Sequence, residues 1–212
     1  QEYSKGKPYK PVEVTGDAED TGTFVTLHPD PEIFQVTRVY KYETLAARLR
    51  ELAYLNKGIH LSLTDKRTLV NDIDENGNEL ETTHYRSDVF YSKEGLREFV
   101  EYLDGGAERL IETPVCLETD KIIPIEIALQ YNTSYTEKIY SYVNNINTIE
   151  GGTHLQGFKM GLTRTLKNYA EKAGMLAKLK FDLAADDFRE GLTAVVSVKV
   201  AEPQFEGQTK TK

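Results

Sequence analysis

The longest apolar stripe in the sequence lies between residues 153 and 175 and has the spacing of an amphipathic α-helix. Its members are three, four, four and three residues apart, which places them on one side of a helix: Leu155, Phe158, Leu162, Leu166 and Tyr169. Gly151 and Gly152 come directly before Thr153, which we predict to be the N-cap. A long helix with one apolar side must pack on another element, so this segment constrains the fold most strongly.

Strand-like segments flank this helix on both sides. Residues 114–119, 122–131 and 139–146 precede the helix, and residues 193–200 follow it. They are short and rich in β-branched and aromatic residues, as strands are. Strands interrupted by a core-facing helix are typical of an α/β (α+β) fold, which we therefore predict. A change of composition near residues 105–113 predicts a boundary between two α/β parts.

The first part of the chain has its own strand and helix patterns. Apolar and polar residues alternate in residues 10–16 and 21–30, so we expect two half-buried strands there. Residues 42–56 and 93–103 have helical spacing, and glycines stand just past their ends. Between these helices, residues 59–65 return as a strand.

Residues 72–83 allow two interpretations, a calcium loop or a hairpin turn. Acidic and amide residues occupy the first, third and fifth positions, and Gly77 occupies the sixth. Thr83 stands where a calcium loop needs a bidentate glutamate, and no helical pattern flanks the segment. Asn76-Gly77 is a favoured two-residue hairpin turn, so we predict a hairpin.

The formal net charge of −8 over 212 residues argues against a general polyanion binder. Any contact with nucleic acid must come from a local basic strip. The apolar fraction of 39% and the charged fraction of 28% indicate a globular protein, and no apolar run is long enough to span a membrane.

Cysteine and histidine usage predicts neither a disulfide nor a metal site. Cys116 is the sole cysteine, and its apolar neighbours Val115 and Leu117 suggest a small core side chain. The absence of disulfide pairs fits a reducing cytoplasm. The four histidines show no ligand spacing among themselves or with Cys116, so no zinc site is expected.

Three cations on the long helix lie away from the apolar stripe or beside it: Lys159, Arg164 and Lys167. A solvated polar face explains such a pattern in most helices. The alternative is a short positive track that contacts phosphates without regard to base sequence. Both interpretations remain open at this point.

The loop before the long helix, residues 144–154, is polar and ends in two glycines. Free backbone N–H groups at a helix start can hold an anion. The same composition is equally compatible with a plain connecting loop.

The C-terminal tip "EGQTKTK" carries an amide and an ammonium group two residues apart, on Gln208 and Lys210. In an extended loop, residues i and i+2 point the same way, so both side chains could grip one phosphate. The pattern alone is also that of a solvated tail.

Four stretches, taken in chain order, resemble the B subunits of bacterial DNA gyrase. They are "TGTFVTLHPDPEIF", "YETLAARLRELAYLNKG", "VNNINTIEGGTHLQGF" and "DDFREGLTAVVSVKVAEPQFEGQTK". The resemblance is collinear over essentially the whole chain, and the last two stretches are highly specific. The B subunit of topoisomerase IV shares these motifs and is the nearest alternative.

The resemblance implies two domains. Residues 1–110 resemble the C-terminal part of an ATPase domain of the GHKL type. Residues 111–212 resemble the transducer domain, which has a fold like domain 2 of ribosomal protein S5, truncated here after the "QTK" loop.

The same resemblance implies roles in nucleotide binding. The transducer lysine that reaches the γ-phosphate of ATP corresponds to Lys210, and the assisting glutamine corresponds to Gln208. The "TGT" strand of the family borders the adenine pocket, which suggests Thr23 as a polar contact and Val25 as a lining residue.

For DNA, the arginine of the family that faces the central cavity corresponds to Lys159. A lysine lacks the bidentate fork of arginine, so we expect looser phosphate capture. Arg164 and Lys167 are expected on the same DNA-facing surface.

The resemblance places the remaining catalytic parts outside this sequence. The catalytic glutamate, the Mg²⁺-binding asparagine, the aspartate that reads adenine and the glycine-rich lid would lie before Gln1. The DNA-cleaving region would follow Lys212. We therefore expect ATP and Mg²⁺ to serve the full-length protein, with metal ligands outside these residues, and the 212 residues alone to be inactive.

The expected function is that of the ATPase component of a type II DNA topoisomerase, which couples ATP hydrolysis to strand passage and, in gyrase, to negative supercoiling. The expected partners are DNA, the gyrase A protein and a second copy that dimerises on ATP binding, in the cytoplasm and without a membrane. A stand-alone, non-catalytic S5-like module that binds nucleic acid is the alternative from another class.

Overall fold

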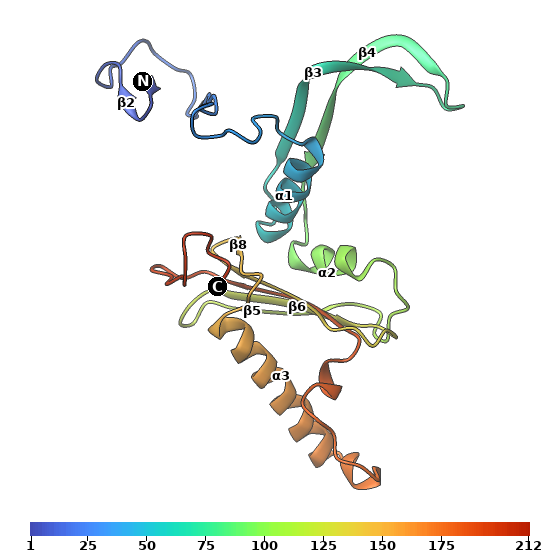
Figure 1. Ribbon diagram of the computed structural model, residues 1–212. Coiled ribbons are helices and arrows are strands. Elements are labelled where there is room, and N and C mark those ends of the chain that lie inside the picture. The colour runs from blue at the N-terminus through green and yellow to red at the C-terminus, as the bar shows by residue number, and fades with distance from the viewer. The chain divides into compact units, whose positions relative to one another are not determined.

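The computed structural model describes the backbone of residues 1–212 and every side chain except that of Lys178. The chain divides into two compact units, residues 1–41 and residues 42–212. Each unit is described by itself (Figure 1).

In the first unit, the backbone forms one short ribbon and is otherwise irregular. β1 (Tyr3–Ser4) pairs antiparallel with β2 (Lys7–Pro8). Lys5 and Gly6 connect them with φ values of 49° and 77°. Positive φ at both central residues is the geometry of the type I′ turn that joins twisted strands.

The strands predicted at residues 10–16 and 21–30 are not formed. Their apolar side chains are not half-buried either, because Val14 and Phe24 are both 93% exposed. A strand requires a hydrogen-bonded neighbour for its N–H and C=O groups, and these segments have none in the unit. The alternation of residues therefore predicted a surface suited to a sheet without predicting that a sheet is there.

The second unit is built on a five-stranded sheet with the order β5-β6-β9-β7-β8. Its strands are β5 (Val115–Thr119), β6 (Ile125–Tyr131), β7 (Lys138–Val143), β8 (Ile146–Asn147) and β9 (Leu192–Val198). β6 pairs antiparallel with β5 and β9, whereas β7 and β9 run parallel. The sheet confirms the strands predicted between residues 114 and 200.

Helix α3 (Thr153–Lys172) makes the crossover between the parallel strands and packs on one face of the sheet. Phe158 and Leu162 of its apolar stripe lie against a cluster that includes Leu129 and Leu192. The stripe continues past the sheet, and Tyr169 is 64% exposed. The 3₁₀ helices η1 (Leu176–Lys178) and η2 (Asp187–Arg189) lead the chain back to β9.

Helices α1 (Tyr42–Leu55) and α2 (Leu96–Asp104) cover the opposite face, as Figure 1 shows. One cluster joins Leu55 of α1 and Phe99 of α2 to Tyr142 of the sheet. Helices on both faces make three layers, which confirms the predicted α/β class. α2 ends at Gly105 in the left-handed conformation, as its glycine stop predicted.

β3 (Leu61–Ile73) and β4 (Glu79–Phe90) form the predicted hairpin, which is longer than the pattern indicated. Its connection spans residues 74–78 and not two residues. The side chain of Asp74 accepts hydrogen bonds from the backbone N–H groups of Asn76 and Asn78, and Gly77 has a φ of 86°. The acidic residue that suggested a calcium ligand thus caps the turn.

Three further expectations differ from the structure. Cys116 is exposed, because β5 is an edge strand and α2 packs mainly on β6 and β9. Thr153 is the first helical residue of α3, and Gly152 is the N-cap. Leu45, expected in the α1 stripe, is 36% exposed. Within the described part of the chain, no helix is long and apolar enough to cross a bilayer.

Gly191 allows β9 to approach the connection after β6. Its φ is +70°, and an added Cβ would lie 2.3 Å from the backbone oxygen of Asn132. We expect Gly191→Ala to lower the free energy of unfolding by more than about 2 kcal/mol, since both backbone strain and a backbone clash oppose it. Urea denaturation monitored by circular dichroism measures the change.

Gly161→Ala is the matched control, because Gly161 lies inside α3 and its Cβ would meet nothing within 4 Å. There the same substitution should raise the free energy of unfolding by about 0.5–1 kcal/mol. Equal effects at the two positions would contradict the assigned role of Gly191.

Candidate functional site

The candidate site lies where the parallel strands end. β7 ends at Val143, β9 ends at Val198, and α3 begins at Thr153, so two carboxyl ends and a helix N-terminus meet at one edge of the sheet. In α/β sheets this edge is the usual place for ligands. The segment after β9 crosses the same edge and ends in the "QTK" tip.

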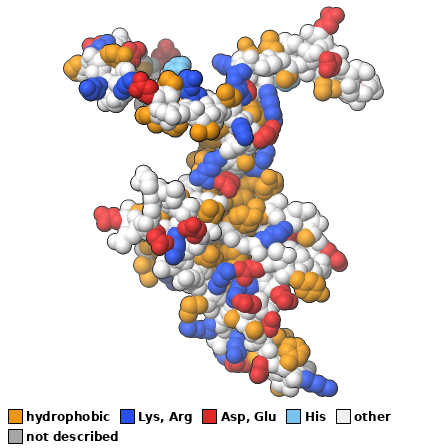
Figure 2. Space-filling view, in the orientation of Figure 1, with side chains coloured by type: hydrophobic (Ala, Val, Ile, Leu, Met, Phe, Trp, Pro, Cys, Tyr) orange, Lys and Arg blue, Asp and Glu red, His pale blue; other side chains and the backbone are white. Residues whose placement is uncertain are grey.

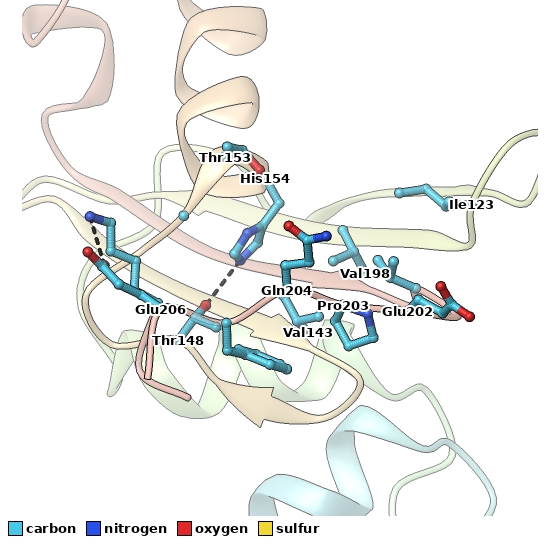
Figure 3. A pocket seen from close by; sticks show the side chains of 14 residues that line it. Ile123, Val143, Thr148, Thr153, His154, Val198, Glu202, Pro203, Gln204 and Glu206 are labelled. Carbon is cyan, nitrogen blue, oxygen red and sulfur yellow. Dashed lines mark hydrogen bonds and ion pairs between the residues drawn. The ribbon is translucent and has the colours of Figure 1, made fainter. Parts of the chain in front are cut away.

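A cavity of about 660 Å³ lies between this edge and the terminal segment. Figure 3 shows its lining, with Val143, Val198 and Pro203 on one side and His154 reaching in from α3. The lining comprises Ile123, Val143, Thr148, Gly152, Thr153, His154, Val198, Val200, Glu202, Pro203, Gln204, Phe205, Glu206 and Lys212.

A buried polar network fixes the start of α3 to the sheet. The hydroxyl of Thr148 donates to the backbone oxygen of Ser141 at 2.9 Å, and the hydroxyl of Ser141 lies 3.0 Å from the backbone oxygen of Thr148. Nε2 of His154 lies 3.0 Å from the Thr148 hydroxyl (Figure 3). Burial lowers the pKa of His154, so its ring is neutral near pH 7 and bonds without adding charge.

The terminal tip is clasped to the loop before α3 by two hydrogen bonds. The backbone N–H of Glu150 donates to the oxygen of Thr211 at 2.9 Å, and the Thr211 hydroxyl donates to the Glu150 carboxylate at 2.9 Å. Within the tip, Lys212 pairs with Glu206 at 3.1 Å, and the Glu206 N–H donates to the Lys212 oxygen at 2.9 Å. These bonds hold both ends of residues 206–212.

Gln208 and Lys210 stand on a tight turn, and the extended geometry expected for them is wrong. The N–H of Lys210 donates to the oxygen of Gly207 at 3.1 Å, and Lys210 has a φ of 57°. The left-handed conformation of a non-glycine residue stores strain, which the clasp at Thr211 sustains. The structure thus replaces the i, i+2 argument with a turn that presents both side chains.

Lys210 is the cation of the tip that lacks a carboxylate partner among the described side chains. Its ammonium lies 5.6 Å from the centre of the Phe205 ring, a cation–π contact, whereas Lys212 is engaged by Glu206. An ammonium held only by a ring face remains available for an anion.

The loop of residues 144–154 is a connecting element at its glycine end. The N–H groups of Glu150 and Gly151 already donate to the oxygens of Thr211 and Thr148. The N–H groups at those two positions are therefore not free to hold an anion, which favours the plain-loop interpretation for this part.

Of the cations predicted to face DNA, Lys159 has an internal partner. Its ammonium pairs with Glu137, whose other oxygen accepts from Nε of Arg189 at 2.7 Å. Burial alone would raise the pKa of Glu137, but the hydrogen bonds from Lys159 and Arg189 outweigh it and lower the pKa. Glu137 is consequently a carboxylate at neutral pH.

Arg164 and Lys167 are both on α3, away from the sheet edge that carries the tip. Lys167 also lines a second cavity of about 660 Å³, together with side chains from the segment between α3 and β9 such as Phe181 and Phe188. The structure thus brings the three cations onto one helix, with Lys159 alone in an ion pair with a described side chain.

Thr23 and Val25 lie in the unit of residues 1–41, outside any strand. Val25 is 74% exposed. Their assignment to an adenine pocket stays a prediction. Among the described side chains, no group of three or more His, Cys, Asp or Glu residues could hold a metal ion.

Sequence reasoning missed four residues that hold the predicted ones in place: Glu137, Glu150, Arg189 and Thr211. Thr211 is adjacent to Lys210 and could have been noticed for that reason. Glu137 precedes Lys159 by 22 residues, and Glu150 precedes Thr211 by 61. Such pairs have no local pattern.

Comparison with known proteins gives a consistent result. The sequence model described as DNA gyrase B matches residues 95–212. The DNA gyrase B protein of Cytophaga aurantiaca is 58% identical over the whole chain, and that of Eisenibacter elegans is 57% identical. The chain spans 42% of the length of each of these relatives.

A solved structure of the 43K ATPase domain of Thermus thermophilus gyrase B, in complex with an aminocoumarin, is also similar. The TM-score is 0.67 and the sequence identity 37%, over 84% of this chain and 44% of that one. The likeness therefore extends from sequence to fold.

The Glu150–Thr211 clasp makes a testable prediction. Thr211→Val keeps the shape of the side chain and removes its hydrogen bond, which is worth about 1 kcal/mol. We expect amide hydrogen exchange at Glu150 and Lys210 to become about fivefold faster.

Thr209→Val is the matched control, since Thr209 is exposed and two residues away. It should leave these exchange rates unchanged. Unaltered exchange in Thr211→Val would show that the clasp does not hold the tip.

Proposed function

The chain belongs to the DNA gyrase B family, and from this premise we propose that it is part of the ATPase component of DNA gyrase, a type II DNA topoisomerase. In that role it couples ATP binding and hydrolysis to DNA strand passage and negative supercoiling. The observation that carries the proposal is the tip of residues 206–212, which offers the ammonium of Lys210 without a carboxylate partner among the described side chains.

The domain division follows from the same premise. Residues 1–110 are assigned to the C-terminal part of the GHKL-type ATPase domain. Residues 111–212 are assigned to the transducer domain, and the sheet with α3 supports this assignment because all five strands lie within it.

ATP is the proposed substrate, and Lys210 is proposed to meet its γ-phosphate. Phosphoryl transfer spreads negative charge over the phosphate oxygens, so a positioned ammonium stabilises the transition state electrostatically. Gln208 lies on the same turn and is proposed to add a neutral amide donor. The clasp fixes the turn in advance, which lowers the cost of positioning these groups.

Thr23 and Val25 are proposed for the adenine side of the same substrate, the first as a polar contact and the second as apolar lining. Mg²⁺ bridges phosphate oxygens and neutralises their charge in such reactions. No residue of this chain is assigned to the metal, and its ligands are placed in other parts of the full-length protein.

DNA is proposed to contact the exposed side of α3 through Lys159, Arg164 and Lys167. The net charge of −8 fits a contact that is local, weak and strongly dependent on salt. The further proposed partners are the gyrase A protein and a second copy of the full-length protein, which dimerises on ATP binding in the cytoplasm.

Matches to DNA gyrase B over the full chain favour this function over the alternative of a stand-alone, non-catalytic S5-like module. Identities of 57–58% to gyrase B relatives favour gyrase over topoisomerase IV, whose solved ATP binding domain from Francisella tularensis is 23% identical and shows the fold alone.

Lys210→Ala in the full-length protein is the decisive test. Because one preorganised donor to a developing anion is removed, we expect ATP turnover to fall by roughly 10²–10³. Gln208→Ala should have a smaller effect, since no charge is lost. Steady-state ATPase rates and dimerisation on a non-hydrolysable ATP analogue give both readouts.

Lys212→Ala removes the same charge two residues away, where Glu206 already neutralises it. It should retain turnover within a few-fold of the unaltered protein, with unchanged melting temperatures for all variants. Turnover by Lys210→Ala at the unaltered rate would rule out the γ-phosphate role.

The proposed DNA surface is tested by replacing Lys159, Arg164 and Lys167 together with Ala in the full-length protein. Loss of three phosphate contacts should flatten the salt dependence by about 2–3 in the log–log slope and lower DNA-stimulated turnover more than basal turnover. Equal losses of both activities would indicate a role of these cations in folding.

A further inference from the structure

The ammonium of Lys159 is held by a carboxylate of the same chain. Glu137 immediately precedes β7 and contacts Lys159 through Oε1, while its Oε2 accepts from Nε of Arg189 at 2.7 Å. A carboxylate that receives a lysine on one oxygen and an arginine on the other occupies these cations much as a phosphate would.

The two sides of this bridge differ in mobility. The Arg189 side chain is 11% exposed and is further fixed by Thr163 at 3.1 Å, by the backbone oxygen of Ala185 at 2.9 Å and by Asp186. The Lys159 side chain is 32% exposed and has Glu137 as its only ionic partner among the described side chains. Arg189 is therefore anchored, whereas Lys159 is the partner that solvent can reach.

Figure 2 shows positive and negative side chains side by side over α3. At the position of Lys159 the charges of the cluster cancel, since Lys159 and Arg189 face Glu137 and Asp186. A neutral cluster binds no excess counterions and gains little from an approaching phosphate.

We propose that Glu137 competes with DNA phosphate for Lys159 and thereby sets the affinity of the α3 surface for DNA. The inference rests on the proposed DNA contact of α3 and identifies the residue that limits it. A phosphate that takes Lys159 leaves Glu137 still bonded to Arg189, so the exchange does not strand a buried carboxylate without a partner.

Glu137→Gln separates this role from a structural one. The amide oxygen can still accept from Nε of Arg189, while the neutral amide no longer holds the Lys159 ammonium. A purely structural role predicts weaker DNA binding, because the cluster is damaged. Competition predicts tighter binding, because Lys159 is released.

The experiment measures binding of a DNA duplex to the full-length protein, closed with a non-hydrolysable ATP analogue, over a range of salt concentrations. One additional phosphate contact steepens the log–log slope by about 0.9, which corresponds to roughly eightfold tighter binding at 0.1 M salt. We expect Glu137→Gln to show both changes.

Two matched controls accompany it. Glu118→Gln removes the same charge from an exposed pair with Lys57 on the edge strand and should change affinity little. Lys159→Ala should weaken binding, and it should abolish the gain when combined with Glu137→Gln.

The outcomes separate the inference from the proposal beneath it. If Lys159→Ala weakens binding but Glu137→Gln does not strengthen it, the competition is overturned and the DNA surface stands. An equal gain in Glu118→Gln would show a general charge effect and overturn it as well. If Lys159, Arg164 and Lys167 all prove irrelevant to binding, the surface itself is wrong and the inference falls with it.

A loss of folding in Glu137→Gln, seen as a lowered melting temperature, is met by Glu137→Asp. The shorter side chain keeps the charge for Arg189 and reaches Lys159 less well. It should raise affinity by a smaller factor than expected for Glu137→Gln, and unchanged or weaker binding would again contradict competition.

Discussion

The parallel pairing of β7 and β9 determines the arrangement of the second unit. Two parallel neighbours cannot be joined by a tight turn, so the chain must cross over, and α3 makes this crossover. The crossover covers one face of the sheet, and α1 and α2 cover the other. Because both strands end at the same edge, the start of α3 and the segment after β9 meet there and form the cavity.

Elements whose signal is local were predictable from the sequence. α1, α2 and α3 follow from apolar spacing with glycine stops, and the strands of the sheet follow from short apolar runs. The segments at residues 10–16 and 21–30 have strand-like alternation, yet a strand depends on a neighbour that alternation cannot specify. The exposure of Cys116 likewise depends on its place in an edge strand, which only the order of the sheet determines.

The site was predictable in its residue types and not in its geometry. Gln208 and Lys210 were found from charge on a glycine-containing tip, but the turn that presents them depends on the bond from Thr211 to Glu150. That bond joins residues 61 positions apart, so no pattern within the tip encodes it. The same holds for Lys159, whose charge was noted while its partner Glu137 was not.

An acidic chain that must meet phosphate can use its cations in two ways, and the two regions of this site differ in that respect. Lys210 has no carboxylate partner among the described side chains, so a single phosphate finds its charge without displacing another group. Lys159 is already neutralised, so a phosphate must exchange with Glu137 and gains only the difference. The first arrangement favours recognition of one small ligand with high charge density. The second keeps binding to a long polyanion weak and reversible, as a protein that must release DNA after each cycle requires.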